Sequence, residues 1–243
     1  MMNIENVDKD TVLVVENLTK QFPLFRLDNI SFRVNKAESI GIIGPNGSGK
    51  TTLINTIIKV YKPTSGKAYF PRIKRKNFFK HVSVQFQETS LTPNLLVRDV
   101  LRVFAYRFKT DWKIVLQLCQ EFNVLHKLSS MAEGLSGGEK QKIGLIIALM
   151  NDPDILFLDE ITSNVDPLAR KDILKKLIQK QNDGKVLIII SHYLEELARL
   201  CNRFILLYSG KKIFDGTFEQ LRQTFSPDDL NASLEDIYEK VYR

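Results

Sequence analysis

Apolar residues follow two different patterns along the chain. Some segments are apolar at nearly every position, which is typical of parallel strands that are covered on both faces. After Lys50, by contrast, Leu53, Ile54, Ile57 and Ile58 recur at helical spacing. We therefore expect an α/β fold with a mostly parallel core sheet. The core strands are expected at residues 39–43, 155–158 and 186–190.

Shorter β-rich runs flank the first core strand. They cover residues 12–15, 30–34 and 67–70, and turn residues lie near each of them. Because they flank the core strand and do not extend it, we expect them to form an antiparallel β subdomain at the edge of the core.

Between Asn94 and Gly134 the pattern is helical, and it predicts a helical lobe inserted between the first and second core strands. Within this lobe Ile114, Leu118 and Phe122 are expected on one apolar helix face. We expect a single domain over residues 1–243. Its lobes are a catalytic core at 11–93 and 136–225, a helical lobe at 94–135 and a tail at 226–243.

Composition and charge exclude few classes of function. A chain of 243 residues with 44% apolar residues can bury one core, and its net charge of +7 suits several anionic partners. Cys119 and Cys201 lack metal-ligand spacing, so we expect core thiols in a reducing compartment. The first ten residues carry acids and do not resemble a secretory signal. No apolar run is long enough to cross a bilayer, so we expect membrane association only through a partner.

The strongest chemical signal is a glycine-rich loop between an expected strand and an expected helix. It satisfies the phosphate-loop pattern G-x-x-x-x-G-K-[ST]. Its backbone N–H groups can surround phosphate oxygens, Lys50 is expected to contact the β- and γ-phosphates, and Thr51 to ligate Mg²⁺. The loop residues are Gly44, Pro45, Asn46, Gly47, Ser48, Gly49, Lys50, Thr51 and Thr52.

Two consecutive carboxylates, Asp159 and Glu160, end the second core strand. The carboxyl ends of strands in such sheets face the ligand crevice. Asp159 is expected to hold Mg²⁺ through water and Glu160 to act as general base on the attacking water. The alternative is a solvated cap for the next helix.

Ser136 and Glu139 have the S-x-x-E spacing of a capping box, which predicts a helix start. The same serine, followed by Gly137 and Gly138, also makes an anion site at a helix N-terminus. Both interpretations can hold together.

The run LSGGEKQK at residues 135–142 resembles the signature sequence of the ATP-binding cassette (ABC) family, and the motifs occur in that family's order over the whole chain. The resemblance implies a P-loop NTPase fold of ABC type that binds and hydrolyses ATP with Mg²⁺.

The resemblance also extends to single residues. Phe22 is similar to the aromatic residue that stacks on adenine, with a core phenylalanine as the alternative. Gln87 matches the glutamine that reaches Mg²⁺ and water, and Gln85 competes for that assignment. Asp166 lies in the loop that crosses to a partner cassette, although Asp-Pro also starts a helix. His192 matches the histidine that contacts the γ-phosphate.

For partners, the resemblance implies a second cassette, identical or paralogous, and a separate membrane-spanning permease subunit at the cytoplasmic face of the cell membrane. Residues 84–99 and 233–238 are similar to cassettes of drug, antibiotic or lipid exporters. The alternative is a soluble ABC ATPase of translation or DNA maintenance. The single phosphate loop disfavours the translation class, which resembles tandem cassettes. Only 85 residues separate Lys50 from Ser136 and no sustained heptads occur, which disfavours the chromosome class with its long coiled coil. No nucleic acid is therefore expected as a partner.

Departures from the family pattern are few: Ile161 replaces a usual proline, Ala37 a usual glycine, and Asn164-Val165 a usual small or apolar pair. None of them removes a group that performs chemistry. The basic run of Arg72, Lys74, Arg75, Lys76 and Lys80 either contacts anionic lipid headgroups or forms a solvated loop.

Overall fold

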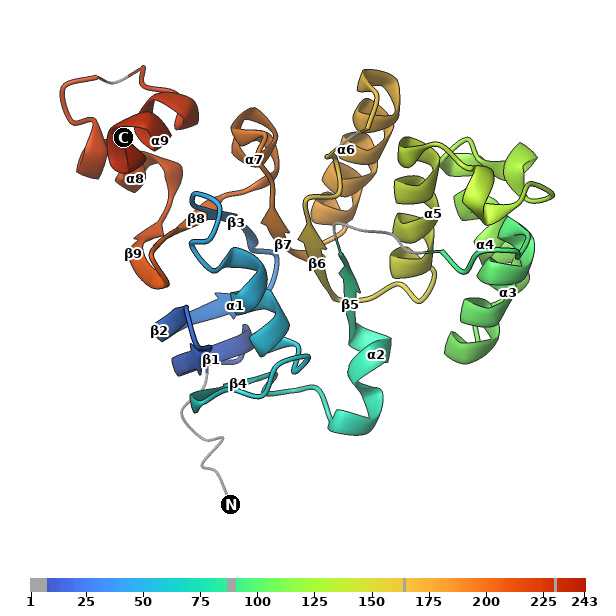
Figure 1. Cartoon of the computed structure of the whole chain (residues 1–243), viewed down its shortest axis with the longest axis horizontal. Helices are drawn as coiled ribbons and strands as arrows, with labels where there is room; N and C mark the ends of the chain where they lie inside the picture. Colours follow the sequence, from blue (N-terminus) through green and yellow to red (C-terminus); the bar gives the residue numbers. More distant parts are fainter. Residues whose placement is uncertain (1–7, 87–90, 164, 230) are drawn as a thin grey trace. The chain divides into compact units, whose positions relative to one another are not determined.

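The computed structural model describes residues 8–86, 91–163, 165–229 and 231–243. The chain separates into two compact units, of which the first comprises Met1–Lys74 and Val186–Arg243 and the second Arg75–Lys185. Figure 1 shows both units and their element labels.

The first unit contains the expected antiparallel sheet, with strand order β2-β1-β4. Its strands are longer than the sequence predicted. β1 continues through the polar pair Glu16-Asn17, because a register shift between Val15 and Leu18 accommodates the left-handed Asn17 (φ 47°). The bounds are β1 Thr11–Gln21, β2 Arg26–Asn35 and β4 Ser65–Tyr69.

A second sheet of the first unit is built on β3 (Ser39–Ile43), which pairs in parallel with β7 (Val186–Ile190) and with β8 (Arg203–Tyr208). β3 and β7 are buried at every position, as their apolar sequences predicted. β8 continues as a hairpin into the antiparallel β9 (Lys211–Gly216).

The helices of the first unit are α1 (Lys50–Ile57), α7 (Leu194–Leu200), α8 (Phe218–Phe225) and α9 (Leu234–Tyr242). α8 packs against β8, β9 and α9, near the C-terminus in Figure 1. Capping boxes at Thr217 and Ser233 begin α8 and α9.

In the second unit, β5 (Val82–Gln85) pairs in parallel with β6 (Ile155–Asp159). The sequence interpretation did not identify β5, which precedes the helical lobe expected from residue 94. A 3-10 turn (Arg75–Asn77) and the short α2 (Phe78–His81) precede β5.

The helices α3 (Val97–Phe108), α4 (Trp112–Glu121) and α5 (Gly137–Leu149) pack against one another in this unit, and α6 (Pro167–Asn182) packs on α5 (Figure 1). Two further 3-10 turns cover Leu125–Lys127 and Ala132–Gly134. The expected apolar face of α4 is shifted by one residue: Ile114 is 46% exposed, whereas Val115 is buried with Leu118 and Phe122.

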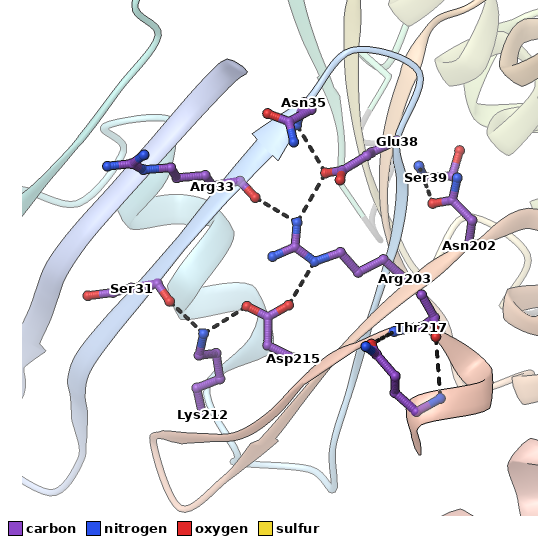
Figure 2. Close-up of polar contacts among 11 residues, drawn as sticks. Ser31, Arg33, Asn35, Glu38, Ser39, Asn202, Arg203, Lys212, Asp215 and Thr217 are labelled. Atoms are coloured by element: carbon purple, nitrogen blue, oxygen red, sulfur yellow. Dashed lines mark hydrogen bonds and ion pairs between the residues drawn. The ribbon is translucent and has the colours of Figure 1, made fainter. Parts of the chain in front are cut away.

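A polar cluster around Arg203 joins β2, β8 and β9 of the first unit (Figure 2). The Arg203 guanidinium donates to Asp215 Oδ1 at 2.8 Å, to Glu38 Oε2 at 3.1 Å and to the Arg33 carbonyl at 2.8 Å. Lys212 Nζ donates to Asp215 Oδ2 and to the Ser31 carbonyl. Burial alone would lower the pKa of Arg203, but the contacts with Asp215 and then Glu38 outweigh it and raise the pKa.

Both cysteines are buried free thiols, as expected of core positions. Burial raises the pKa of Cys119 to about 11 and raises that of Cys201 further. Within the described ranges, no helix is long and apolar enough to cross a membrane.

Candidate functional site

The glycine-rich loop connects the buried strand β3 directly to α1. Gly49 stands at the N-cap of α1 with φ 104°, a conformation that favours glycine. A side chain at Gly49 would also meet the ring of Phe25, whose Cζ lies 2.8 Å from an ideal Cβ position. The turn is closed by a hydrogen bond from Ser48 N to the Pro45 carbonyl at 3.1 Å.

Lys50 is the charged centre of this loop. It is buried (7% exposed), and its Nζ donates to the carbonyls of Gly44 at 2.8 Å and Pro45 at 3.1 Å. The ammonium is therefore folded back into the loop, at the positive N-terminal end of α1, whose first turn contains no acid. A buried cation and a helix N-terminus at one place favour an anionic ligand.

The hairpin turn between β8 and β9 is hydrogen-bonded to the phosphate loop. Gly210 N donates to the Ser48 carbonyl at 3.1 Å, and the Gly210 carbonyl accepts from Asp28 N at 2.8 Å. Gly210 has φ 78°, and an added Cβ would lie 1.8 Å from the Arg26 carbonyl oxygen. The sequence interpretation missed this residue, although Ser-Gly between two apolar runs is a turn signal.

Two aromatic residues, Phe22 and Phe25, lie between β1 and β2. The Phe22 ring is half-buried, edge-on to Tyr61 at 5.5 Å between centroids, and Lys20 Nζ lies 5.1 Å from its centroid. Phe22 is thus not a core residue, which leaves the adenine-stacking role open. Phe25, which the sequence did not single out, contacts the loop through Gly49.

His192 lies at the same edge of the sheet as the phosphate loop. Ile42 of β3 pairs with Ile190 of β7 in parallel register, so Gly44 and His192 each follow a paired residue by two positions. His192 is exposed, and Tyr193 N donates to Ser191 Oγ at 3.0 Å to fix the turn after β7. The first unit therefore brings Phe25 against the loop and places His192 at the same sheet edge, whereas Phe22 packs on Tyr61, which follows α1.

In the second unit, Asp159 and Glu160 stand at the end of β6, as the sequence predicted, with exposures of only 2% and 9%. Glu160 has φ 51°, a left-handed conformation that costs a non-glycine residue about 1 kcal/mol. Strain of this kind clusters at functional sites. Ser163 N donates to the Glu160 carbonyl at 3.0 Å, so a tight turn follows the carboxylates.

Ser136 begins α5 with the predicted capping box. Ser136 Oγ accepts from Glu139 N at 3.3 Å, and Glu139 Oε2 accepts from Ser136 N at 2.9 Å. Burial would raise the pKa of Glu139, but the ion pair with Lys127 at 2.9 Å and the Ser136 contacts lower it. Ser136 and Gly137 themselves are exposed, so the helix start remains accessible to a ligand.

Asp166 lies beside this helix start. Asp166 caps α6 by accepting from Leu168 N at 3.1 Å and Ala169 N at 3.0 Å, with Pro167 in the first turn. An ideal Cβ at Gly138 would lie 3.1 Å from Asp166 Oδ2, so only a very small residue fits between α5 and Asp166. The second unit thus brings Ser136, Gly138 and Asp166 together.

The two competing glutamines differ in what the structure describes. Gln85, at the end of β5, is buried, and its Nε2 donates to Gln141 Oε1 at 2.8 Å and to the Gln141 carbonyl at 3.1 Å. Gln85 therefore joins β5 to α5, the helix that Ser136 begins, a contact that sequence reasoning did not foresee. Gln87 and Asn164 lie outside the described residues.

The predicted metal ligands carry oxygen donors, which suit Mg²⁺. Among the described residues, no three His, Cys, Asp or Glu side chains form a group that could hold a metal ion. Mg²⁺ with a nucleotide needs only one or two carboxylates, because phosphate oxygens and water complete its shell. A hydroxyl such as that of Thr51 and a carboxylate such as that of Asp159 are ligands of the required type.

Comparison with known proteins gives one consistent family. The family model described as "ABC transporter" matches residues 27–163. The chain is 33% identical over 238 residues to the probable multidrug ABC transporter ATP-binding protein YbhF of Escherichia coli (strain K12), covering 94% of this chain and 39% of that protein. It is 35% identical over 198 residues to the Nod factor export ATP-binding protein I of Burkholderia pseudomallei (strain 1710b), covering 78% of this chain and 65% of that protein. The chain therefore spans less than two thirds of the length of these relatives.

Solved structures agree with this result. A structure described as the ATP-binding subunit of an ABC transporter superposes with a TM-score of 0.86 at 25% identity, over 95% of this chain and 99% of that one. A nucleotide-free ATP-binding cassette from an ABC transporter superposes with a TM-score of 0.75 at 25% identity, over 94% and 98%. With the phosphate loop, the carboxylates after β6 and the serine-capped α5 all in place, this chain belongs to the ABC transporter family and has the fold of its ATP-binding domain.

Proposed function

We propose that this chain binds Mg-ATP and hydrolyses it as the ATP-binding subunit of an ABC transporter. The observation that carries the proposal is the phosphate loop, where the buried Lys50 ammonium, held by the carbonyls of Gly44 and Pro45, lies at the N-terminus of α1. A loop of this kind offers a cation, backbone N–H groups and a helix N-terminus to the same phosphates.

Each residue of the first unit has a role in this proposal. Lys50 and the loop amides bind the phosphates, and exchanging the carbonyl contacts of Lys50 for phosphate oxygens costs little because an ammonium has three donors. The half-buried ring of Phe22 offers a face to adenine. His192, at the same sheet edge, contacts the γ-phosphate.

The second unit supplies the hydrolytic groups. Glu160, which is buried beside the end of β6, orients and deprotonates the attacking water. Asp159 and Gln87, with Thr51 of the first unit, would hold Mg²⁺, which would supply positive charge to the phosphate oxygens.

Ser136, Gly137, Gly138 and Asp166 form a second half-site that binds the nucleotide of a partner cassette. The exposed start of α5 supports this role, because its backbone N–H groups and positive end are accessible. Two cassettes, identical or paralogous, would then enclose two ATP molecules and separate after hydrolysis.

The transport role follows from the relatives, whose names describe multidrug transport and Nod factor export. These names support export and favour transport over a role in translation or DNA maintenance. The chain would then work at the cytoplasmic face of the membrane, bound to a separate membrane-spanning subunit that selects the cargo.

Two experiments test this proposal. Lys50→Ala is expected to lower ATP affinity by about 100-fold, since a charged contact to phosphate contributes about 1.5–3 kcal/mol, whereas Lys62→Ala, on an exposed lysine of the same unit, leaves affinity unchanged. Equal ATP affinity in the two variants would refute the binding mode.

The transport part is tested by purifying the tagged chain from detergent-solubilised native membranes and identifying its partners by mass spectrometry. A polytopic membrane protein in near-equal amount is the expected result. Ribosomal or chromosomal proteins without a membrane partner would refute the transporter role and leave ATP hydrolysis intact.

A further inference from the structure

The proposed ATPase chemistry makes no use of the most basic segment of the chain. Residues 71–81, between β4 and β5, contain five Lys or Arg residues and no acid. All five are exposed, and none of them has an ion pair with another described residue. The five cations are Arg72, Lys74, Arg75, Lys76 and Lys80.

An exposed aromatic residue, Phe79, lies between Lys76 and Lys80 in the sequence. Phe79 is 62% exposed, and its ring packs edge-to-face on Phe78 at 5.4 Å between centroids. Exposing a ring of this size to water is unfavourable in the free chain. Aromatic rings beside cations are typical of surfaces that lie in the membrane interface.

Hydrogen bonds fix Phe79 and His81 of this segment within the second unit. His81 Nδ1 lies 2.6 Å from Asp154 Oδ2, and the His81 carbonyl accepts from Asp154 N at 2.9 Å. Asn151 Nδ2 donates to the Phe79 carbonyl at 2.9 Å. These bonds use backbone atoms and His81, so they anchor α2 without engaging the side chains of Phe79 and Lys80.

Two acids of the second unit, Asp152 and Asp154, have partners other than the Lys and Arg side chains of the segment. Asp152 binds Lys185 at 3.0 Å and Lys180 at 3.2 Å. Asp154 binds His81 and lies 3.8 Å from Lys185. The positive charge of the segment is therefore available to an external partner.

We propose that the part of this segment that lies in the second unit, residues 75–80, binds the anionic surface of a lipid bilayer. Its cations lie against the headgroups and the Phe79 ring enters the interface. A single-stranded nucleic acid is the competing polyanion, but it is bound by successive stacking aromatics, and this segment has one well-exposed ring. The inference rests on the proposed role at a membrane. Because vesicle binding is measured without ATP turnover, the lipid-binding proposal and the ATPase proposal can each fail while the other holds.

The test is co-sedimentation of the full chain with phosphatidylcholine vesicles that contain about 30% phosphatidylglycerol, at about 0.1 M salt. We expect binding to these vesicles and none to pure phosphatidylcholine. The triple variant R75Q/K76Q/K80Q is expected to bind about 100-fold more weakly, since each near-surface cation contributes about fivefold. K76Q and K80Q alone are each expected to weaken binding about fivefold, which keeps the test valid if the triple variant fails to fold.

The matched control is K113Q/K171Q/K175Q, which removes the same charge from exposed lysines on α4 and α6 of the same unit. It is expected to bind as the wild type does. Phe79→Ala is expected to weaken vesicle binding about tenfold without altering its salt dependence, because it removes apolar contact and not charge. ATP affinity is expected to stay unchanged in all of these variants.

Three results would overturn the inference. The first is equal binding of the wild type to neutral and anionic vesicles. The second is an equal loss of vesicle binding in the triple variant and in its control. The third is that the wild type binds a single-stranded RNA more tightly than vesicles and that the triple variant loses this RNA binding.

Discussion

Replacing Arg203 by Met tests whether the polar cluster at the start of β8 stabilises the first unit. Arg203 is 22% exposed and donates to Asp215, Glu38 and the Arg33 carbonyl at distances of 2.8–3.1 Å. Removing one partner of a buried ion pair costs about 3–5 kcal/mol, because the remaining carboxylates lose their counterion. Asp215 keeps Lys212 as a partner, and the site is partly solvated, so the lower end, about 3 kcal/mol, is expected.

The assay is urea unfolding followed by circular dichroism, with thermal unfolding as a second measure. A loss of about 3 kcal/mol corresponds to a fall in Tm of about 6–12 °C for a chain of this size. Arg33→Met is the control, because the Arg33 side chain is exposed and Figure 2 shows it directed away from the cluster, to which only its carbonyl contributes. The control is expected to change stability by no more than about 0.5 kcal/mol. Equal stability of the two variants would refute the reasoning.

Three further predictions follow from backbone geometry and burial. Gly210→Ala is expected to lower the free energy of unfolding by more than about 3 kcal/mol and to weaken ATP binding, because its Cβ would lie 1.8 Å from a carbonyl oxygen of β2. Gly184→Ala is the control, since Gly184 has a similar φ of 79° and open space around it. In urea unfolding this control is expected to lose only about 1 kcal/mol. Ala37→Gly is expected to stabilise the chain by about 0.5 kcal/mol, since Ala37 has φ 58°; a destabilised variant would contradict this. Burial raises the pKa of Cys119 to about 11 and raises that of Cys201 as well, so both thiols stay protonated near neutral pH, and a thiol reagent is expected to label them only after unfolding.

Most of the parallel strands could be predicted because their sequences are apolar throughout. β3, β6 and β7 are buried at every position, and the predicted ranges match them to within one residue. β5 escaped prediction because Ser83 and Val84 are only half-buried and its sequence of four residues is too short to show a period. The α4 face was misplaced by one residue, because apolar residues at 114, 115, 118 and 122 fit two overlapping helical faces.

Sequence reasoning identified the site residues whose side chains can bind or react with a ligand. It missed contacts that position the site from elsewhere in the chain. The capping box at Ser136 and the cap at Asp166 are confirmed as local structure, because both depend on spacing along the chain. Gly210, Phe25 and the Gln85–Gln141 contact depend on residues that are far apart in sequence. No local pattern specifies such contacts, so only the fold reveals them. The catalytic and binding roles themselves stay predictions.

The measurement that tests the central claim most directly is ATP hydrolysis by the purified chain and by its Glu160→Gln variant, with ATP affinity measured on the same samples. The variant keeps the shape of Glu160 but cannot accept the proton, so we expect unchanged ATP affinity and a kcat lower by about 100-fold or more. A Glu160→Gln chain that hydrolyses ATP at the wild-type rate would contradict the assignment of Glu160 as general base. A wild-type chain that neither binds nor hydrolyses ATP would contradict the account as a whole.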